Sequence, residues 1–478
     1  MSGTATPTAV APVPSDDVAV AAQERLEALC DPGSFRPLRS GVLSDRLGDR
    51  ARSGDGVVAG AGQVGGRPAF CYAQDPGFMG GSLGAAHADS IVRVMRLAGD
   101  AGAPVVGFIE SGGARLQEGH AGLAGYGRIF RASVELSGKV PQISVVTGVS
   151  AGGGSYSPAL TDFVLMTGAA RMFLTGPRVV RQALGEEVTM EQLGGPRVHE
   201  GNGVCQLVAD SERAATDRAR ELLGLLPGRI GEELPRAAPA PPGAPDPDAP
   251  VPAEARRVYD VRDVVEAIVD AGWLLEISSR WARNVLTGFA RIEGRPVGIV
   301  ANQPRRLGGV IDAAASEKAA GFVRLCDRFG LPLVVLVDTP GFMPGQRQEN
   351  AGVIRHGAAL LRAFAAASVP RLTVILRKAF GGAVITMNSR DLGADMVFAW
   401  PCAEIGIMAA SQAVGIVHRR QLRDAGDPES LGAALADAYA EQHLTSAAAA
   451  ATGFIDEVIE PADTRSSLAW ALASLEGR

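Results

Sequence analysis

The chain has 478 residues, of which 46% are hydrophobic and 21% are charged, and its formal net charge is −6 at pH 7. This is the composition of an ordinary globular protein and excludes a disordered chain. The acidic balance argues against a broad nucleic-acid surface, and no apolar run approaches the ~20 residues of a membrane helix. We therefore expect neither nucleic acid nor a membrane as a partner.

The N-terminal stretch lacks both the basic start and the long apolar core of a signal peptide. We predict a disordered tail over residues 1–20 on a cytoplasmic protein. The five cysteines are scattered without any CxxC spacing, which is typical of reduced, mostly buried thiols. The six histidines show no HExxH or HxH spacing, so we predict no protein-bound metal.

The same succession of glycines and prolines occurs twice, over about residues 66–166 and 294–400. Arg67-Pro68 recurs as Arg295-Pro296, an offset of 228 residues, and Gly152-Gly153 recurs as Gly381-Gly382, an offset of 229. Further matched positions are Gly80-Gly81 and Gly308-Gly309, Pro104 and Pro332, Glu110 and Asp338, Gly113 and Gly341, Pro141 and Pro370, and Asp162 and Asp391. Because glycine and proline mark special backbone dihedral angles, this ordered set indicates one fold built twice.

Within each copy, short β-branched runs alternate with longer helical patterns. The predicted strands are 105–109 and 143–147 in the first copy and 333–337 and 372–376 in the second; the predicted helices are 86–98 and 315–328. Continuous apolar strands separated by helices predict an α/β fold with buried, largely parallel strands. The alanine-rich stretch 430–451 predicts helices that close the second domain.

A proline- and alanine-rich stretch over residues 225–253 separates the two copies. Such a composition cannot pack a core and tends toward extended polyproline conformations. We therefore predict an N-terminal domain over residues 21–224, a linker over 225–256 and a C-terminal domain over 257–478.

Each copy contains a strand, a sharp turn of small residues and then a helix, with SAGGG at 150–154 and AFGGA at 379–383. A glycine pair at a helix start lets two backbone N–H groups point at a ligand oxygen, aided by the helix dipole. A lone pair usually serves only close packing, but this one occurs twice in matched positions. Two such turns predict a reaction in which two carbonyl-bearing partners both develop negative charge.

The first turn also matches the GxSxG pattern of serine hydrolases, through Gly148, Ser150 and Gly152. Ala379 stands where Ser150 should recur, and neither copy supplies a clear acid and histidine partner. A hydrolase is therefore the weakest of the alternatives.

Many ordered segments have counterparts in one known family. They are SGGARLQEG (111–119), SAGGGSYSPALTDF (150–163), GIVANQP (298–304), VDTPGFMPG (337–345), RKAFGGAVITMNSRDLGAD (377–395) and AWPCAEIGIM (399–408). Together they resemble the carboxyltransferase β subunits of biotin-dependent acyl-CoA carboxylases. DPGSF (31–35) and GFIDEVIEPADTR (453–465) extend the resemblance to both ends of the chain.

The resemblance implies two tandem crotonase-like domains, each a β-β-α superhelix, in a homo-hexamer whose active sites combine domains of different protomers. It implies transfer of a carboxyl group from carboxybiotin, held on a separate carrier protein, to the α-carbon of an acyl-CoA. The products would be malonyl-, methylmalonyl- or longer alkylmalonyl-CoA, and the partners a biotin carboxylase and a biotin carboxyl carrier protein. A biotin-linked decarboxylase or transcarboxylase subunit and a non-catalytic acyl-CoA-binding subunit stay open as alternatives.

The resemblance also implies roles for the two turns. The amides of Gly152 and Gly153 would hold the acyl-CoA carbonyl, and those of Gly382 and Ala383 the biotin carbonyl. The biotin nitrogen is the implied base, which explains why no catalytic histidine stands out. Further substrate-binding candidates are Gly112, Gly113, Arg115, Tyr156, Val384 and Ile385.

Several candidates have a structural alternative. Arg115 would contact a CoA phosphate or form a structural ion pair, and Tyr156 and Asn388 would line the pocket or brace the turn. The matched Asp162 and Asp391 are interpreted as caps or fold determinants.

Two departures from the family pattern concern specificity. Val384-Ile385 replaces the usual Tyr-Asp or Tyr-Ile, which makes the acyl wall apolar and removes bulk. Gly154-Ser155 replaces the usual Ala-Val after the first glycine pair. We therefore expect retained carboxyl transfer with altered acyl specificity.

Overall fold

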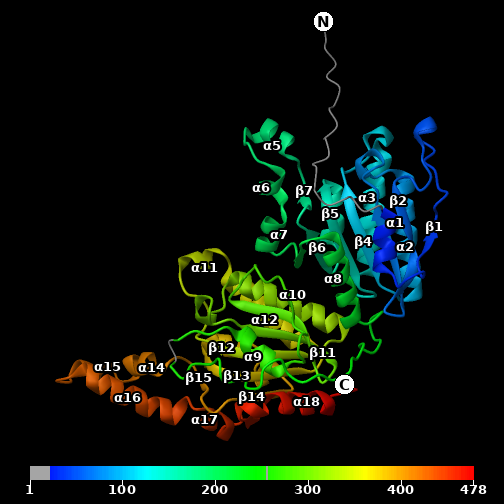
Figure 1. The fold of residues 1–478 in the computed structure, drawn as a ribbon. Coiled ribbons are helices and arrows are strands. Elements are labelled where there is room, and N and C mark those ends of the chain that lie inside the picture. Colours follow the sequence, from blue (N-terminus) through cyan, green and yellow to red (C-terminus); the bar gives the residue numbers. More distant parts are fainter. Residues whose placement is uncertain (1–21, 255–256, 478) are drawn as a thin grey trace.

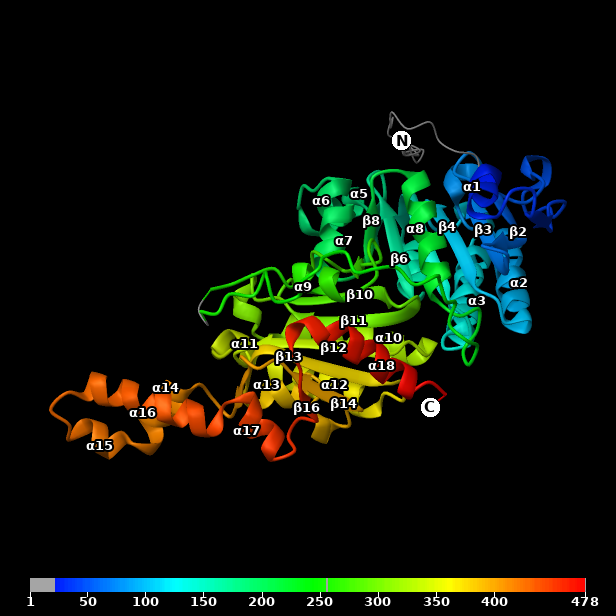
Figure 2. The ribbon, with the colours of Figure 1, turned by 60° about the horizontal axis from the view of Figure 1, so that its bottom comes forward.

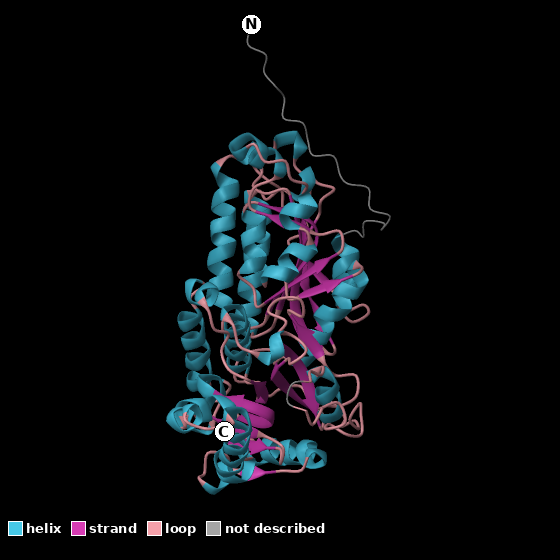
Figure 3. Cartoon of the chain, turned by 90° about the vertical axis from the view of Figure 1, so that its left-hand side faces the viewer, coloured by secondary structure: helices cyan, strands magenta, loops and turns pink. Residues whose placement is uncertain are grey.

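The computed structural model describes residues 22–254 and 257–477, so the predicted tail over residues 1–20 lies outside the described residues. Within that part, the chain forms two eight-stranded sheets of the same topology, one in each half. Figure 1 shows the first half in blue to green and the second in green to red, and Figure 3 shows helices on both sides of the strands. The predicted doubling of one α/β fold is confirmed.

The first half runs from α1 to α8. Its elements are α1 (Ala22–Leu29), β1 (Arg36–Leu38), β2 (Val57–Val64), β3 (Arg67–Gln74), α2 (Ala85–Ala101), β4 (Val105–Ser111), α3 (His120–Leu136), β5 (Gln142–Ala151), α4 (Gly153–Ala159), β6 (Phe163–Thr167), β7 (Arg171–Phe173), α5 (Pro177–Leu184), α6 (Met190–Gly194), α7 (Pro196–Asn202), β8 (Leu207–Ala209) and α8 (Glu212–Leu225).

The second half runs from α9 to α18. Its elements are α9 (Val261–Ile268), β9 (Leu275–Ile277), β10 (Val285–Ile292), β11 (Arg295–Asn302), α10 (Ala313–Phe329), β12 (Leu333–Thr339), α11 (Gln346–Asn350), α12 (Val353–Ala366), β13 (Arg371–Phe380), α13 (Gly381–Thr386), β14 (Met396–Ala399), β15 (Glu404–Gly406), α14 (Ala410–Val417), α15 (Arg419–Arg423), α16 (Pro428–His443), α17 (Ser446–Ala451), β16 (Glu457–Val458) and α18 (Thr464–Ser474).

The strand orders are β1-β2-β3-β4-β5-β6-β8, with β7 paired to β5, and β9-β10-β11-β12-β13-β14-β16, with β15 paired to β13. The first three strands of each sheet are antiparallel and the later pairs are parallel. The predicted strands fall in β4, β5, β12 and β13, and the predicted helices in α2 and α10. Parallel strands end at one edge of a sheet, so the two glycine turns after β5 and β13 lie at the carboxyl edges.

The two halves share one hydrophobic core, which draws buried residues from both sheets. The ring of Phe289 on β10 lies 5.9 Å from that of Phe163 on β6 and 5.1 Å from that of Phe322 on α10. Beside these rings, Asp162 and Arg328 form an ion pair of 2.6 Å in which the aspartate is buried. The halves are therefore packed as one body.

The segment between α8 and α9 is bound along the second half. Over the described residues 226–254 and 257–260 it forms only an isolated bridge, between Pro242 and Asp270. Arginines of the second half donate to its carbonyls: Arg291 to Pro235 at 2.8 Å and Arg465 to Ala240 at 2.8 Å. Since proline-rich chain cannot pair as a strand, these side chains satisfy its carbonyl oxygens instead.

The alanine-rich stretch 430–451 is helical as predicted, but α16 does not close the second domain, because it buries none of its residues. Helices α14, α15 and α16 extend away from the body of the molecule (Figures 1 and 2). Alanine favours the helix but supplies little apolar area to bury. Ile407, Ile416 and Val417 are 78%, 65% and 67% exposed along this arm.

The structural counterpart of Asp162 is Asp395, not the predicted Asp391. The Asp162 carboxylate accepts the N–H of Gln142 at 2.9 Å, and the Asp395 carboxylate accepts that of Arg371 at 2.8 Å. Asp391 lies instead in an exposed 3-10 turn. The connection between α13 and β14 contains this extra turn, which shifts the repeat by a further four residues.

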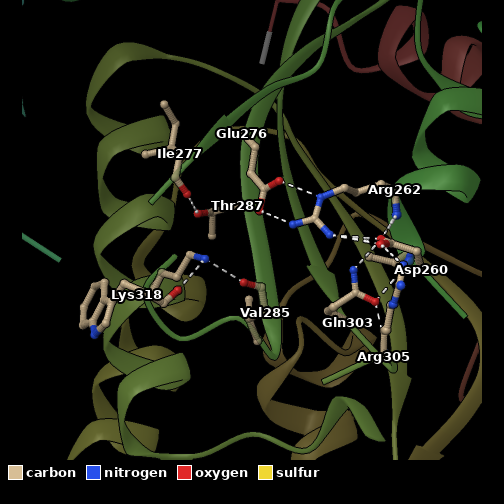
Figure 4. A network of polar contacts seen from close by, with 11 residues as sticks. Asp260, Arg262, Glu276, Ile277, Val285, Thr287, Gln303, Arg305 and Lys318 are labelled. Atoms are coloured by element: carbon tan, nitrogen blue, oxygen red, sulfur yellow. Dashed lines mark hydrogen bonds and ion pairs between the residues drawn. The ribbon is translucent and has the colours of Figure 1, made fainter. Parts of the chain in front are cut away.

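A polar network holds the start of the second half (Figure 4). Arg262 on α9 donates to both carboxylate oxygens of Glu276, at 2.7 and 2.8 Å. Nearby, the amine of Lys318 on α10 donates to the carbonyls of Trp281 and Val285, at 3.0 and 2.8 Å. Lys318 is 4% exposed, and burial lowers its pKa from 10.5 to about 8.

This buried amine predicts a pH dependence of stability. Below about pH 8 Lys318 is protonated in the folded and unfolded chains alike. Between its folded pKa of about 8 and the ordinary lysine pKa of 10.5, the unfolded chain carries a proton that the folded chain has lost. Stability of the wild type relative to Lys318→Met should therefore rise by roughly 3 kcal/mol across that range. Urea unfolding of both proteins at several pH values measures the difference. A difference independent of pH from 7 to 11 would contradict the prediction.

Candidate active site

The first glycine turn joins β5 to α4 through a conformation that glycine adopts readily. Gly152 has φ 58° and ψ −124°, and α4 begins at the next residue. The hydroxyl of Ser155 donates to the carbonyls of Ser150 and Phe173, at 2.7 and 2.8 Å. These contacts hold the start of α4 against β5 and β7.

The N–H groups of this turn have different surroundings. Gly152 N–H donates to the carbonyl of Phe173 at 3.1 Å, so in this structure it is already bonded. Those of Gly153 and Gly154 lie in the first turn of α4, where a helix leaves its N–H groups without intrahelical partners. Of the predicted pair Gly152 and Gly153, the second is therefore placed to receive a ligand oxygen without breaking a bond.

The second glycine turn joins β13 to α13 and repeats the first. Gly381 has φ 65°, close to that of Gly152, so Gly382 and Ala383 match Gly153 and Gly154. A Cβ at Gly382 would meet no atom within 4 Å. Of the predicted pair Gly382 and Ala383, both lie at a helix start, but open space adjoins Gly382 only, because Ala383 is fully buried.

The loop after β4 brings Gly112 and Gly113 to the first turn. A Cβ at Gly113, which has φ 98°, would lie 3.4 Å from the carbonyl oxygen of Ala151 at the end of β5. Gly113 N–H donates to the hydroxyl of Ser111 at 3.3 Å. The two segments, about forty residues apart in the chain, form one face.

Arg115 is a structural residue. Its side chain is fully buried and forms ion pairs with Asp55 at 2.5 Å and Glu118 at 2.8 Å. It also donates to the carbonyls of Asp55 and Ser82, at 3.1 and 2.9 Å. Of the two interpretations, the structural ion pair is confirmed, since a guanidinium enclosed by these partners cannot reach a CoA phosphate.

The other candidates divide by exposure. Tyr156 is 51% exposed and its ring lies 6.2 Å from that of Phe130. Ile385 is 46% exposed, whereas Val384 is buried in the core. These two consecutive residues at the helix start therefore point to different sides, and the extra room predicted at Val384 stays a prediction. Ile385 alone of the two presents an apolar surface.

Asn388 braces the second turn. It is buried at φ 61°, its carbonyl accepts the hydroxyl of Thr373 at 2.8 Å, and its amide donates to that hydroxyl at 2.9 Å. The bracing role predicted for this residue is confirmed.

Ser150 is not arranged as a nucleophile. It is fully buried, and its hydroxyl has no hydrogen-bond partner among the described residues. A catalytic serine needs a base within hydrogen-bond reach, so the GxSxG match is a consequence of the glycine turn.

The sequence did not predict that the matched acids Glu110, partly buried, and Asp338, fully buried, form ion pairs behind the two turns. Glu110, at the end of β4, pairs with Arg25 at 3.0 Å, and Asp338, at the end of β12, pairs with Arg377 at 3.1 Å. Burial raises the pKa of Glu110. These acids occupy matched positions in the repeat, and that recurrence was the available signal for a structural role.

Two kinds of feature are absent from the part of the chain that the structure describes. No group of three or more histidines, cysteines or acids there is placed to hold a metal ion. No helix there is long and apolar enough to cross a membrane. Cys30, Cys71, Cys205 and Cys326 are buried and Cys402 is exposed, as expected for scattered thiols.

Comparison with known proteins identifies the family. The carboxyl transferase domain matches residues 19–477. The chain is 44% identical to a propionyl-CoA carboxylase carboxyltransferase subunit of Haloferax mediterranei, over 96% of this chain and 90% of that one. It is 42% identical to the methylmalonyl-CoA decarboxylase α subunit of Propionigenium modestum, over 96% and 90%.

A solved structure agrees with these relatives. It is a transcarboxylase 12S hexamer assembly with methylmalonyl-coenzyme A and methylmalonic acid bound. It superposes with a TM-score of 0.92 at 46% identity, over 95% of this chain and 89% of that one. The chain therefore belongs to the carboxyl transferase family. It is a carboxyltransferase subunit of the family that contains the biotin-dependent acyl-CoA carboxylases and transcarboxylases.

The open face at Gly382 gives a sharp test of the second turn. Gly382→Ala meets no neighbour and improves helix propensity, so the variant should unfold at the same or a higher urea concentration. Its new methyl group would stand beside the N–H groups predicted to receive a ligand oxygen, so carboxyl transfer should fall about tenfold or more.

The matched control is Gly321→Ala on the exposed side of α10, where a Cβ also meets no atom within 4 Å. It should keep full activity. Equal activity of the two variants would show that the second turn does not receive a substrate group.

Proposed function

We propose that this chain transfers a carboxyl group between carboxybiotin, held on a separate carrier protein, and the α-carbon of an acyl-CoA with an apolar acyl group. The observation that carries the proposal is the pair of matched helix starts after β5 and β13, each with a positive-φ glycine followed by two amides.

The first turn would serve the acyl thioester. When the α-proton leaves, negative charge develops on the thioester oxygen, and the N–H of Gly153 with a neighbouring glycine amide would receive it. Gly152 N–H would have to leave Phe173 to take part, whereas Gly154 N–H would not. The positive end of α4 adds to the stabilisation.

The second turn fits the ureido carbonyl of biotin, because the open side of Gly382 leaves its N–H accessible. Carboxybiotin supplies the carboxyl group when it is bound. Gly382 and Ala383 would hold the ureido oxygen by hydrogen bonds as it gains charge, and so favour release of that group. These residues supply orientation and electrostatics, so no acid or base side chain is required of them.

Ile385 supports an apolar acyl group. It follows Ala383 by two residues and is half exposed, so an acyl chain beside the second turn would meet a hydrocarbon side chain. A carboxylate at this position would have to be desolvated against such a chain.

The assembly would be a homo-hexamer served by a biotin carboxylase and a biotin carboxyl carrier protein. Ile416 and Val417 in the arm formed by α14 to α16, and Ile407 just before it, are exposed, and α5 buries none of its residues. Exposed apolar side chains favour association with another chain. The related transcarboxylase 12S forms a hexamer, and a second copy on these surfaces would bring halves of different protomers together.

The proposal covers transfer in both directions. The similar proteins include a carboxylase, a decarboxylase and a transcarboxylase subunit. Forward and reverse transfer share one transition state, so the same turns would serve each.

The test is a carboxylation assay with a generic biotin carboxylase and biotin carrier protein, across acetyl-, propionyl-, butyryl- and longer acyl-CoAs. We expect turnover, and we expect Ile385→Asp to lower turnover of the longer acyl-CoAs about tenfold while changing acetyl-CoA least. Absence of turnover in both directions, with CoA esters still bound, would replace this proposal by a non-catalytic acyl-CoA-binding role.

A further inference from the structure

The two glycine turns differ in what lies beneath them. A Cβ at Gly153 would lie 2.8 Å from ring atoms of Tyr126, on α3, whereas a Cβ at the matched Gly382 meets nothing within 4 Å. Gly153 therefore rests directly on an aromatic ring. Tyr126 is 4% exposed, so the ring itself is held by the core.

The hydroxyl of Tyr126 connects this turn to the neighbouring loop. It lies 3.2 Å from the hydroxyl oxygen of Ser111, and that oxygen accepts the N–H of Gly113 at 3.3 Å. One side chain thus contacts both segments that form the face of the first turn. In the second half the hydroxyl of Thr339 accepts the N–H of Gly341 at 3.3 Å, as the hydroxyl of Ser111 accepts that of Gly113.

Gly154 leaves room for the contact between Tyr126 and Ser111. A Cβ there would lie 3.1 Å from the hydroxyl oxygen of Ser150, 3.4 Å from that of Tyr126 and 3.6 Å from the Cβ of Ser111. The absence of a side chain at Gly154 lets three hydroxyl-bearing residues gather under the first turn of α4. The second half carries Ala379 in place of Ser150.

We propose that Tyr126 is a positioning residue that holds the amides of Gly153 and Gly154 in the geometry required by the acyl thioester. The inference rests on the proposed function of the first turn. An oxyanion site works because its donors are fixed before the reaction, and small displacements of them cost rate. Tyr126 fixes the turn from below through its ring and ties it to the Gly112-Gly113 loop through its hydroxyl. The second turn has no such ring beneath Gly382, so it should not depend on Tyr126.

The test uses Tyr126→Phe, which keeps the ring and removes the hydroxyl. In the reconstituted assay with propionyl-CoA, kcat should fall about tenfold while KM stays within about twofold, because the lost positioning matters only in the transition state. Carboxybiotin decarboxylation without acyl-CoA, which would use the second turn, should be unchanged. In the double variant Tyr126→Phe with Ser111→Ala the two losses should be less than additive, because both changes break the Tyr126–Ser111 contact, while Ser111→Ala also removes the acceptor of the Gly113 N–H.

The matched control is Tyr72→Phe. Tyr72, on β3, is also buried in the first half, where its ring packs against Gly107, and its variant should keep the kinetics of the wild type. An unchanged kcat in Tyr126→Phe would overturn the proposal. A parallel fall of acyl transfer and carboxybiotin decarboxylation would also overturn it, because that pattern indicates a general loss of structure.

Hydrogen exchange provides a readout that does not depend on turnover. Amides of residues 150–157 should exchange about tenfold faster in Tyr126→Phe than in the wild type or in Tyr72→Phe, while those of residues 379–386 should not change. Unchanged exchange at 150–157 would refute the bracing role even if the wild type were inactive. A wild type without carboxyl transfer, but with this exchange pattern, would instead refute the proposed function and retain the brace.

Discussion

The core shared by the two halves is the constraint on which the rest of the structure depends. Each sheet is covered by its own helices, yet Phe163, Phe289 and Phe322 form one continuous aromatic contact across the junction. Burying a large aromatic side chain removes substantial apolar area from water. Separating the halves would expose this area again and would therefore cost free energy. The ion pair of Asp162 with Arg328 then fixes their relative orientation, because a buried carboxylate requires its partner.

Within each half, the turn is held by groups behind the sheet edge. Glu110 and Asp338 stand at the ends of β4 and β12, and their N–H groups donate to the buried amides of Gln74 and Asn302, at 3.1 and 3.3 Å. The pairing of β4 with β5 and of β12 with β13 shifts register at these acids. The glycine turns that follow β5 and β13 begin the short helices α4 and α13.

The features that the sequence predicted are those encoded locally. Glycine positions required by positive φ recur at Gly152 and Gly381, and apolar runs mark the buried strands, so the doubled α/β fold and the two turns could be inferred. Other features depend on contacts between distant segments. Arg115 meets Asp55 across sixty residues, Val384 is buried in the core while Ile385 is half exposed, and Gly152 N–H bonds to Phe173. No local sequence pattern predicts these three contacts, because each depends on which distant segment packs against the residue.

Under the proposed function, duplication would explain how one fold can bind two unlike carbonyl groups. Both turns have the same backbone, so both would stabilise a developing oxyanion by the same means. The positions around them were then free to diverge: Tyr126 lies beneath Gly153, whereas open space adjoins Gly382. A ring beneath one turn suits a thioester whose α-carbon must be held still for bond formation, because orientation contributes much of the rate. An unobstructed turn suits a group that arrives on a carrier and must leave after each transfer. The different packing beneath the two turns thus fits the different demands of the acyl thioester and of the group that arrives on a carrier.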